Sequence, residues 1–264
     1  MDMIGFIGMG NMGTAMLKGA KRTFDGSRII FHRKSVDKMK ELAEEEKVNY
    51  AMSNSEVVEK SKYIILAIKL QMFEKVIDEI NDSLDNDKVI ISLAPGFTIT
   101  QLKEKLKAGR IVRSMPNTPA MIGEGMTGVC FDENEFDENE IDVINKIFEA
   151  TGKAKKVDEK LMNSVVCASG SSPAYVFMFI EALADSAVKC GLPRKDAYEF
   201  VAQTVLGSAK LMLETGKHPG ELKDMVCSPG GTTIAGVAEL EKNGFRKAIF
   251  EATDACFNKC NNIK

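Results

Sequence analysis

Short apolar runs alternate with amphipathic stretches along the first half of the chain. Runs typical of strands buried on both faces lie at residues 3–8, 28–31, 63–67, 88–92 and 110–113. Between them, charged stretches such as 35–46 and 73–80 carry apolar residues at helical spacing. Two further strand candidates, 126–131 and 152–157, flank a predicted helix over 138–150. Regular alternation of strand and helix predicts a parallel sheet covered by helices.

The pattern changes after Val157, where strand-like runs give way to long helical stretches. Predicted helices cover residues 161–168, 173–190, 194–214, 219–226 and 231–260, the last with a break at 243–244. Glycine at 191 suits a helix C-cap, and proline at 193 suits the start of the next helix. We therefore expect an α/β fold, with an N-terminal Rossmann-type doubly wound sheet over residues 1–157 and an all-α domain over residues 158–264.

The predicted helix over 173–190 is apolar around most of its circumference. Such a helix has to be surrounded, and the short helical half leaves little mass to wrap it. We expect subunit association to cover this helix. The alternative is that the neighbouring helices of the same chain bury it.

Composition adds few constraints to this picture. The chain has 264 residues, of which 28% are charged, and a net charge of −3, so no nucleic-acid or acidic-membrane partner is indicated. Uninterrupted apolar runs such as 63–68 are far short of the ~20 residues that span a bilayer, so no transmembrane helix is expected. The first residues lack the features of a signal peptide, and a cytoplasmic protein is expected.

Cysteine and histidine usage excludes several kinds of site. None of the six cysteines forms a C-x-x-C pair, which argues against a zinc ribbon or a thioredoxin-type site. The two histidines, His32 and His218, lie in unrelated contexts. A Ser-His-Asp triad and a histidine-rich metal centre are therefore not expected, and no bound metal is predicted.

The strongest motif follows the first predicted strand. Residues 8–13 match G-x-G-x-x-G at the head of a predicted helix, and they are Gly8, Met9, Gly10, Asn11, Met12 and Gly13. Gly8 allows the tight turn, Gly10 lets the backbone approach a pyrophosphate, and Gly13 lets the helix pack on the sheet. The helix N-terminus would hold the anion, so the motif predicts a dinucleotide site.

A basic turn follows the second predicted strand, where an NAD-binding protein would carry Asp or Glu. The residues there are His32, Arg33, Lys34 and Ser35. Two or three cations and a hydroxyl suit a 2′-phosphate, which favours NADPH as cofactor, with NADH possible. The alternative is a solvated basic turn at a strand end. In either interpretation His32 has no catalytic role.

Other segments lie where doubly wound folds place ligand contacts. Asn54 is near a helix start, and Ala67, Ile68 and Lys69 end a strand, although Lys69 could equally be a solvated lysine. Loops at 92–96 and 115–119 also follow strands. In the helical half, small residues at 169–173 and 227–233 open helices and could seat a carboxylate, or could simply cap those helices.

Taken together, the motifs resemble pyrroline-5-carboxylate reductases in order and spacing over essentially the whole chain. The resemblance rests on I-G-F-I-G-M-G-N-M-G, L-A-I-K, S-M-P-N-T-P, S-G-S-S-P-A-Y, L-K-D and C-S-P-G-G-T-T-I-A-G. It implies reduction of L-Δ1-pyrroline-5-carboxylate to L-proline by NAD(P)H, the last step of proline biosynthesis. It also implies a Rossmann domain joined to an all-helical dimerisation domain, with dimers often assembled into larger rings.

The resemblance also implies site residues. The cofactor would lie on residues 8–13 and on Arg33, Lys34, Ser35, Asn54, Ala67, Ile68, Lys69, Pro95 and Asn117. The substrate would lie on Ser228, Gly230, Gly231, Thr232 and Thr233, with Glu159 on the far side of its ring. Thr233 would also hydrogen-bond the ring nitrogen. The chain departs from the family pattern at Leu70, Pro95 and Met225, which puts any side-chain contact expected at Met225 in doubt.

The implied chemistry needs little acid–base catalysis. A pyrrolinium ion already carries its proton, so positioning against the nicotinamide suffices, and Thr233 can supply a hydrogen bond or a relay at the nitrogen. Tyr175 is a second candidate donor, but its apolar neighbours favour a core position.

A β-hydroxyacid dehydrogenase or related imine reductase is the alternative enzyme. Such enzymes typically need a lysine on a helix, and none occurs from 161 to 188. A non-catalytic NADPH-binding protein is the third possibility.

Overall fold

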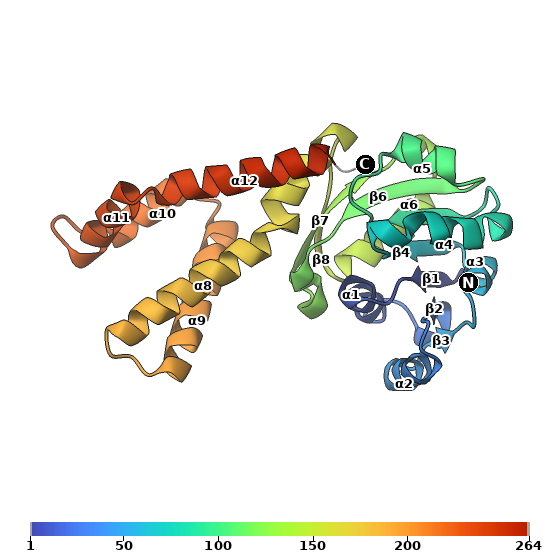
Figure 1. Ribbon diagram of the computed structural model, residues 1–264, viewed down its shortest axis with the longest axis horizontal. Coiled ribbons are helices and arrows are strands. Elements are labelled where there is room, and N and C mark those ends of the chain that lie inside the picture. The colour runs from blue at the N-terminus through green and yellow to red at the C-terminus, as the bar shows by residue number, and fades with distance from the viewer. Residues whose placement is uncertain (1, 263–264) are drawn as a thin grey trace. The chain divides into compact units, whose positions relative to one another are not determined.

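The computed structural model describes residues 2–262, and contacts divide the chain into two compact units (Figure 1). The first unit runs to Ser171 and takes up the chain again at Phe257. The second unit is Ser172–Cys256. The chain therefore passes from one unit to the other twice.

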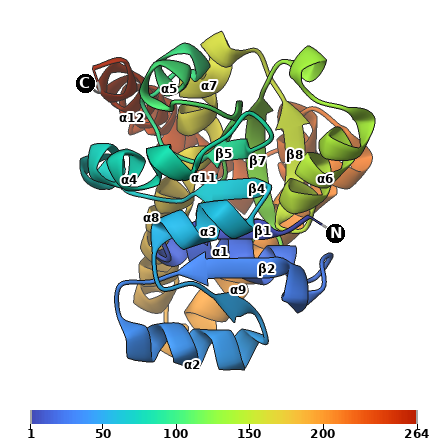
Figure 2. The ribbon, with the colours of Figure 1, turned by 90° about the vertical axis from the view of Figure 1, so that its right-hand side faces the viewer.

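An eight-stranded sheet in the order β3-β2-β1-β4-β5-β6-β7-β8 forms the centre of the first unit (Figure 2). The strands are β1 Ile4–Ile7, β2 Ile29–His32, β3 Asn49–Tyr50, β4 Tyr63–Leu66, β5 Val89–Ser92, β6 Arg110–Met115, β7 Gly125–Cys130 and β8 Gly152–Lys156. The first six are parallel, in the order typical of doubly wound dinucleotide-binding sheets. The expected fold class is confirmed.

The sheet is not parallel throughout, so that part of the prediction was wrong. β7 pairs with β6 in the antiparallel direction, and β8 pairs with β7 in parallel. Residues 116–124 link β6 to β7, and this link is shorter than the dozen or so residues of a crossover. The chain therefore returns beside β6, and the helix α6, Glu138–Glu149, makes the crossover to β8. The two-residue strand β3 was also not predicted.

Helices cover both faces of the sheet. The first face carries α1 Asn11–Ala20, α2 Val36–Glu46 and α6, and the second carries α3 Asn54–Lys60, α4 Phe73–Ile80 and α5 Ile99–Lys105. Alternate residues of each central strand enter the two cores: in β4, Tyr63 and Ile65 lie in the first core, and Ile64 and Leu66 in the second. This double burial explains why the strands read as continuous apolar runs.

Residues 158–171 belong to the sheet unit, although they follow the predicted domain boundary at 157/158. Here α7, Met162–Val165, leads into a π-helical turn, Val166–Gly170. Met162 is fully buried and packs with Met115 and Cys130 at one end of the sheet. Contacts therefore place the division at Ser171, because this short segment folds back onto the strands instead of joining the helices that follow it.

The second unit consists of the helices predicted from residue 173 onward, including the break at 243–244. They are α8 Ser172–Lys189, α9 Arg194–Thr215, α10 Pro219–Val226, α11 Thr232–Lys242 and α12 Phe245–Asn261, whose last turns belong to the first unit. Ala184, Ala197 and Val201 form its small buried cluster. Phe177 and Phe250 remain 63% and 70% exposed. The helices of one chain therefore leave much of their apolar surface uncovered.

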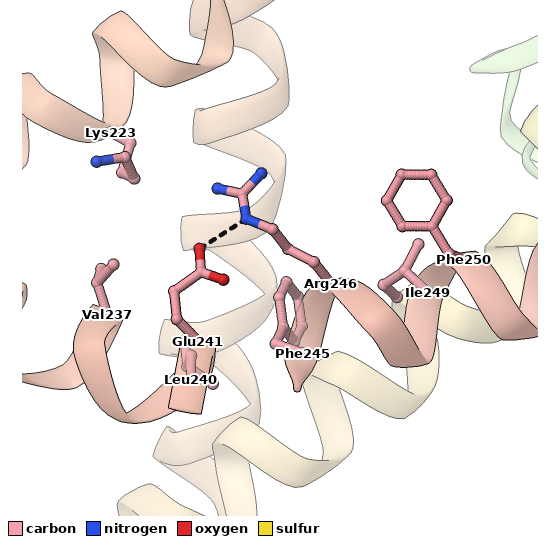
Figure 3. Close-up of a pocket in the computed structure, with 8 residues that line it drawn as sticks. All are labelled: Lys223, Val237, Leu240, Glu241, Phe245, Arg246, Ile249 and Phe250. Carbon is pink, nitrogen blue, oxygen red and sulfur yellow. Dashed lines mark hydrogen bonds and ion pairs between the residues drawn. The ribbon is translucent and has the colours of Figure 1, made fainter. Parts of the chain in front are cut away.

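Figure 3 shows part of this uncovered surface. Apolar side chains of α11 and α12 surround a pocket of about 370 Å³, and they include Val237, Leu240, Phe245, Ile249 and Phe250. At its edge the Nε atom of Arg246 donates to Oε1 of Glu241 at 2.6 Å.

One helical stretch, residues 159–189, is long and apolar enough to cross a membrane by length and composition. The uninterrupted apolar runs predicted no such helix, because polar residues interrupt this stretch without lowering its mean hydropathy below 1.3. Only 6% of its apolar window is buried within the chain. A helix at an interface between subunits can be as apolar as a membrane-spanning helix, because the partner subunit covers the faces that its own chain leaves exposed.

Candidate functional site

The turn between β1 and α1 has the backbone geometry that a bound phosphate requires. Gly8 has φ +94°, and a Cβ atom there would come 2.5 Å from the carbonyl oxygen of Ala67. A Cβ atom on Gly13 would collide with the carbonyl oxygen of Gly8. On Gly10 it would meet nothing within 4 Å. Two glycines are thus required for packing, whereas Gly10 keeps the backbone open toward a ligand.

The first turn of α1 is suited to an anion. Gly10 is the N-cap residue and provides no side-chain cap, and the first turn contains no acidic residue. The first N–H groups of a helix have no partner within the helix, and the helix dipole adds positive potential there. Backbone groups of this turn can therefore bind a pyrophosphate without help from a charged side chain.

A pocket of about 320 Å³ lies beside this turn and gathers most of the predicted cofactor residues. Those that line it are Gly8, Met9, Gly10, Arg33, Lys34, Asn54, Ala67, Ile68 and Lys69. Those that do not line it are Asn11, Met12, Gly13, Ser35, Pro95 and Asn117. Asn11–Gly13 form the first turn of α1, and Ser35 is the N-cap residue of α2.

The charges around the pocket favour an anionic ligand. Arg33 and Lys34 follow β2, and Lys69 follows β4 on the same edge of the sheet. None of the described residues that line the pocket is acidic. An NAD-type site would have a carboxylate beside the ribose, so this lining fits a 2′-phosphate instead.

Asn54 is held in place by a neighbouring helix. Its Nδ2 atom donates to Oε2 of Glu79 at 2.7 Å, and Glu79 belongs to α4. Ser53 caps the start of α3 by accepting from the backbone N–H of Glu56. The amide of Asn54 is thereby oriented, and its oxygen is the atom left to accept a hydrogen bond from a ligand hydroxyl.

His32 also lines the pocket, although sequence reasoning treated it only as part of the basic turn. It ends β2 and is half-buried, with Nδ1 lying 3.0 Å from the carbonyl oxygen of Ala51. Its position as the last residue before the basic turn was the available signal. Met72 and Val76 complete an apolar wall that the motif search did not find either.

Asn117 has a structural role in this unit that its motif did not indicate. The residue is 8% exposed, its Nδ2 atom donates to the carbonyl oxygen of Ser169 at 3.1 Å, and its Oδ1 atom accepts from Met126 at 2.9 Å. Both ends of the amide thus connect the chain after β6 to neighbouring segments. Its contact with a cofactor stays a prediction.

Glu159 is engaged within the first unit. Its Oε1 atom accepts from the backbone N–H of Ile99 at 2.6 Å and from Nη1 of Arg113 at 3.1 Å. Arg113 belongs to β6 and is 4% exposed, so Glu159 neutralises a buried guanidinium and also bonds to the first residue of α5. Its role toward a substrate stays a prediction.

The predicted carboxylate-binding segment opens α11 in the second unit. Gly230 has φ +69°, which glycine adopts readily, and the N–H of Gly231 donates to the carbonyl oxygen of Ser228 at 3.0 Å. Gly231 is the N-cap residue without a side-chain cap, and no acidic residue lies in the first turn. Thr232 and Thr233 are exposed there. The first-turn N–H groups and two hydroxyls are thus available to a carboxylate.

Met225 lies just before this segment and is 66% exposed. Its sulfur is 3.9 Å from Nζ of Lys217. An exposed thioether thus occupies the position where the sequence resemblance led us to expect a polar side chain.

Comparisons with known proteins agree along the whole chain. A family model described as pyrroline-5-carboxylate reductase dimerisation matches residues 159–263. A model described as NADP oxidoreductase, coenzyme F420-dependent, matches residues 3–96.

Individual relatives cover nearly the full length. A pyrroline-5-carboxylate reductase of Escherichia coli (strain K12) is 49% identical over 259 residues, which are 97% of this chain and 96% of that protein. One of Arabidopsis thaliana is 41% identical and covers 96% of this chain and 92% of its own. The crystal structure of a Plasmodium falciparum pyrroline carboxylate reductase with NADP bound is similar, with a TM-score of 0.88, 32% identity, and coverage of 98% and 97%.

Proposed function

The chain belongs to the pyrroline-5-carboxylate reductase family, and we propose that it reduces the C=N bond of L-Δ1-pyrroline-5-carboxylate to L-proline with NADPH. The observation that carries this proposal is the 49% identity over 97% of the chain to a protein of that name. The open glycine turn and the basic pocket support it independently, since they suit a phosphorylated dinucleotide.

The residues of the first unit would hold the cofactor. Bound NADPH supplies the hydride for the imine carbon. The first turn of α1 would bind the pyrophosphate, while Arg33 and Lys34 would bind the 2′-phosphate. Asn54 would accept from a ribose hydroxyl through the oxygen that Glu79 leaves free.

The α11 segment would orient the substrate. Its first-turn N–H groups, with the hydroxyls of Ser228 and Thr232, would bind the carboxylate at fixed distance and direction. Thr233 would form a hydrogen bond with the ring nitrogen, so the substrate would be held at both its carboxylate and its ring nitrogen. Glu159 would approach the opposite side of the ring while keeping its bond to Arg113.

Proton supply places few demands on these residues. A cyclic imine near neutral pH can bind as the pyrrolinium ion, whose nitrogen already carries the proton that the product amine keeps. The protein then has to hold the substrate ring in the orientation that lets the hydride reach it, and no side chain has to act as a strong acid toward the nitrogen. This mechanism suits a chain with two histidines.

The assay is direct. Purified full-length protein with pyrroline-5-carboxylate should oxidise NADPH and form proline, with a higher kcat/KM for NADPH than for NADH. The double variant R33A/K34A should lose most of that preference while keeping turnover with NADH. Binding of NADPH without oxidation would contradict the proposal and favour a non-catalytic binding protein, whereas oxidation with a 3-hydroxyacid would favour the dehydrogenase alternative.

The same membership supports proposals for the assembly and the location of the protein. The dimerisation-domain match and the bare apolar helices support a homo-oligomer built through the helical domain. We place the enzyme in the cytoplasm and propose that its dimers can assemble into a larger ring. Sedimentation at several protein concentrations distinguishes a dimer from a ring.

A further inference from the structure

His32 lies at the position from which dinucleotide-binding sheets read the ribose. It is the last residue of β2, and it lines the same pocket as Arg33 and Lys34. In such sheets the end of the second strand carries either a carboxylate, which accepts a hydrogen bond from the 2′-hydroxyl of NAD, or a cation, which pairs with the 2′-phosphate of NADP. An imidazole at this point can do either, depending on its protonation.

The contact with Ala51 determines which ring nitrogen carries the proton. Nδ1 of His32 lies 3.0 Å from the carbonyl oxygen of Ala51, and a carbonyl oxygen can only accept. Nδ1 is therefore the protonated nitrogen of the neutral ring. Nε2 is left for a ligand, as an acceptor when the ring is neutral and as a donor when the ring is cationic.

We propose that His32 is a specificity-determining residue that selects between a 2′-phosphate and a 2′-hydroxyl by taking up a proton. A ribose hydroxyl can donate to neutral Nε2, which favours NADH. The oxygens of a dianionic phosphate only accept, so they pair with Nε2 once the ring is protonated, which favours NADPH. This inference rests on the proposed function only for the class of cofactor.

The neighbouring charges do not compete with this effect. Arg33, Lys34 and Lys69 line the same pocket. Arginine and lysine side chains ordinarily stay cationic from acid to mildly alkaline pH, so their attraction for phosphate is not expected to vary over that range. Glu56 of α3 is the carboxylate that acts on His32, and it is bonded to Lys60 and to the N–H of Met52. These bonds lower the pKa of Glu56 and keep it anionic. Of the described residues that line the pocket, His32 is the one with an imidazole, the side chain that ordinarily changes charge near neutral pH.

The test uses adenosine 2′,5′-bisphosphate and AMP as probes, with calorimetry on the full chain from about pH 6 to about pH 8.5. The matched control is His32→Asn, whose amide nitrogen replaces Nδ1 toward Ala51 and which cannot titrate. We expect bisphosphate affinity of the native protein to fall about tenfold more than that of the variant, which corresponds to one unit of linkage. AMP affinity should not fall. The phosphate of the probe titrates in the same way with both proteins, so its effect on affinity cancels when the native protein is compared with His32→Asn.

Proton uptake gives a second readout. In buffers of different ionisation enthalpy, the native protein should take up more protons on binding the bisphosphate than His32→Asn does. Equal uptake, or equal pH dependence of affinity, would overturn the proposal. His32→Gln, which also cannot titrate, replaces the control if His32→Asn does not fold.

Turnover separates this proposal from the proposed function. The ratio of kcat/KM for NADPH to that for NADH should fall with pH in the native enzyme and change less in His32→Asn. A protein that reduces pyrroline-5-carboxylate with the same pH dependence as its variant would refute the role of His32 alone. Proton-linked bisphosphate binding without reduction of the imine would refute the proposed function alone.

Discussion

Gly10 and Gly13 lie three residues apart, yet their substitutions should have opposite consequences. Gly10→Ala introduces a methyl group into open space, with φ −82° already acceptable to alanine, so stability should change by no more than ~1 kcal/mol. Its NADPH affinity should fall at least tenfold, because the methyl group occupies the path of the pyrophosphate.

Gly13→Ala instead forces a Cβ atom against the carbonyl oxygen of Gly8, which should cost about 1–3 kcal/mol of unfolding free energy. Urea denaturation and calorimetry on both variants test the contrast. Equal stability of the two variants would show that the turn adapts to a side chain at either position.

Thr233 is the residue on which the proposed chemistry depends most. Thr233→Ala should lower kcat/KM for pyrroline-5-carboxylate about ten- to a hundredfold, because one or two hydrogen bonds of ~1–2 kcal/mol are lost at the reacting centre. Thr233→Ser keeps the hydroxyl and should retain most of the activity, and NADPH affinity should be unchanged in both. Native kinetics in Thr233→Ala would remove this residue from the mechanism.

Sequence reasoning predicted the residues after strand ends that line the pocket beside the glycine turn. The glycine turn, Arg33, Lys34 and Lys69 were predicted because parallel strands deliver their carboxyl ends to one edge. It could not find the bonds of Asn117 to Met126 and Ser169, because they join segments distant in the chain. The ring orientation of His32 depends in the same way on Ala51.

At the scale of elements, a buried carboxylate joins the helix α6 to the amino ends of two parallel strands, β4 and β6. Glu140 of α6 is 3% exposed and accepts two bonds from Arg110, at the start of β6, at 2.5 and 2.7 Å. Lys62, just before β4, lies 3.0 Å from it. Burial by itself would raise the pKa of Glu140, but these bonds outweigh it and lower the pKa to about 2.

This pKa predicts how stability depends on pH. A carboxyl with a folded-state pKa of about 2 stabilises the fold fully above its unfolded value near 4.3, and loses that contribution as pH falls toward about 2. The contribution amounts to about 3 kcal/mol at neutral pH. Urea denaturation of native protein and Glu140→Gln should show a difference in unfolding free energy that is constant above about pH 5 and shrinks below about pH 4. A constant difference at all pH values would contradict the assignment.

Elements with a local signal were predicted and those without one were not. The core strands read as apolar runs because both faces are buried, and helices such as α2 and α4 showed their apolar stripe. β3 has two exposed residues and too short a pattern to detect. The reversal of β7 depends on the length of its link to β6, and the attachment of residues 158–171 depends on Met162 packing against the sheet.

At the scale of the whole molecule, the bare apolar helices predict that folding and association are coupled. Phe177→Asp and Phe250→Asp place a charge where the native side chain is 63% and 70% exposed in one chain, so little intrachain packing is lost. Aromatic residues of this kind contribute about 2 kcal/mol or more at the centre of an interface. Sedimentation should therefore show dissociation of at least one variant, with a Tm that falls on dilution.

Lys195→Glu is the control, since Lys195 is an exposed residue of α9 that already carries a charge. Both phenylalanine variants should differ from it if the apolar surface is the interface. Variants that sediment like the control at all concentrations would mean that another surface joins the subunits.

The chain passes between its two compact units twice, after Ser171 and after Cys256. Near these passages Nδ2 of Asn163 donates to Oδ1 of Asn261 at 2.9 Å, which joins the outgoing and returning segments on the side of the sheet unit. A protease cut in one of these passages therefore leaves the helical unit covalently attached to the sheet unit through the other, so that release of Ser172–Cys256 requires both passages to be cut.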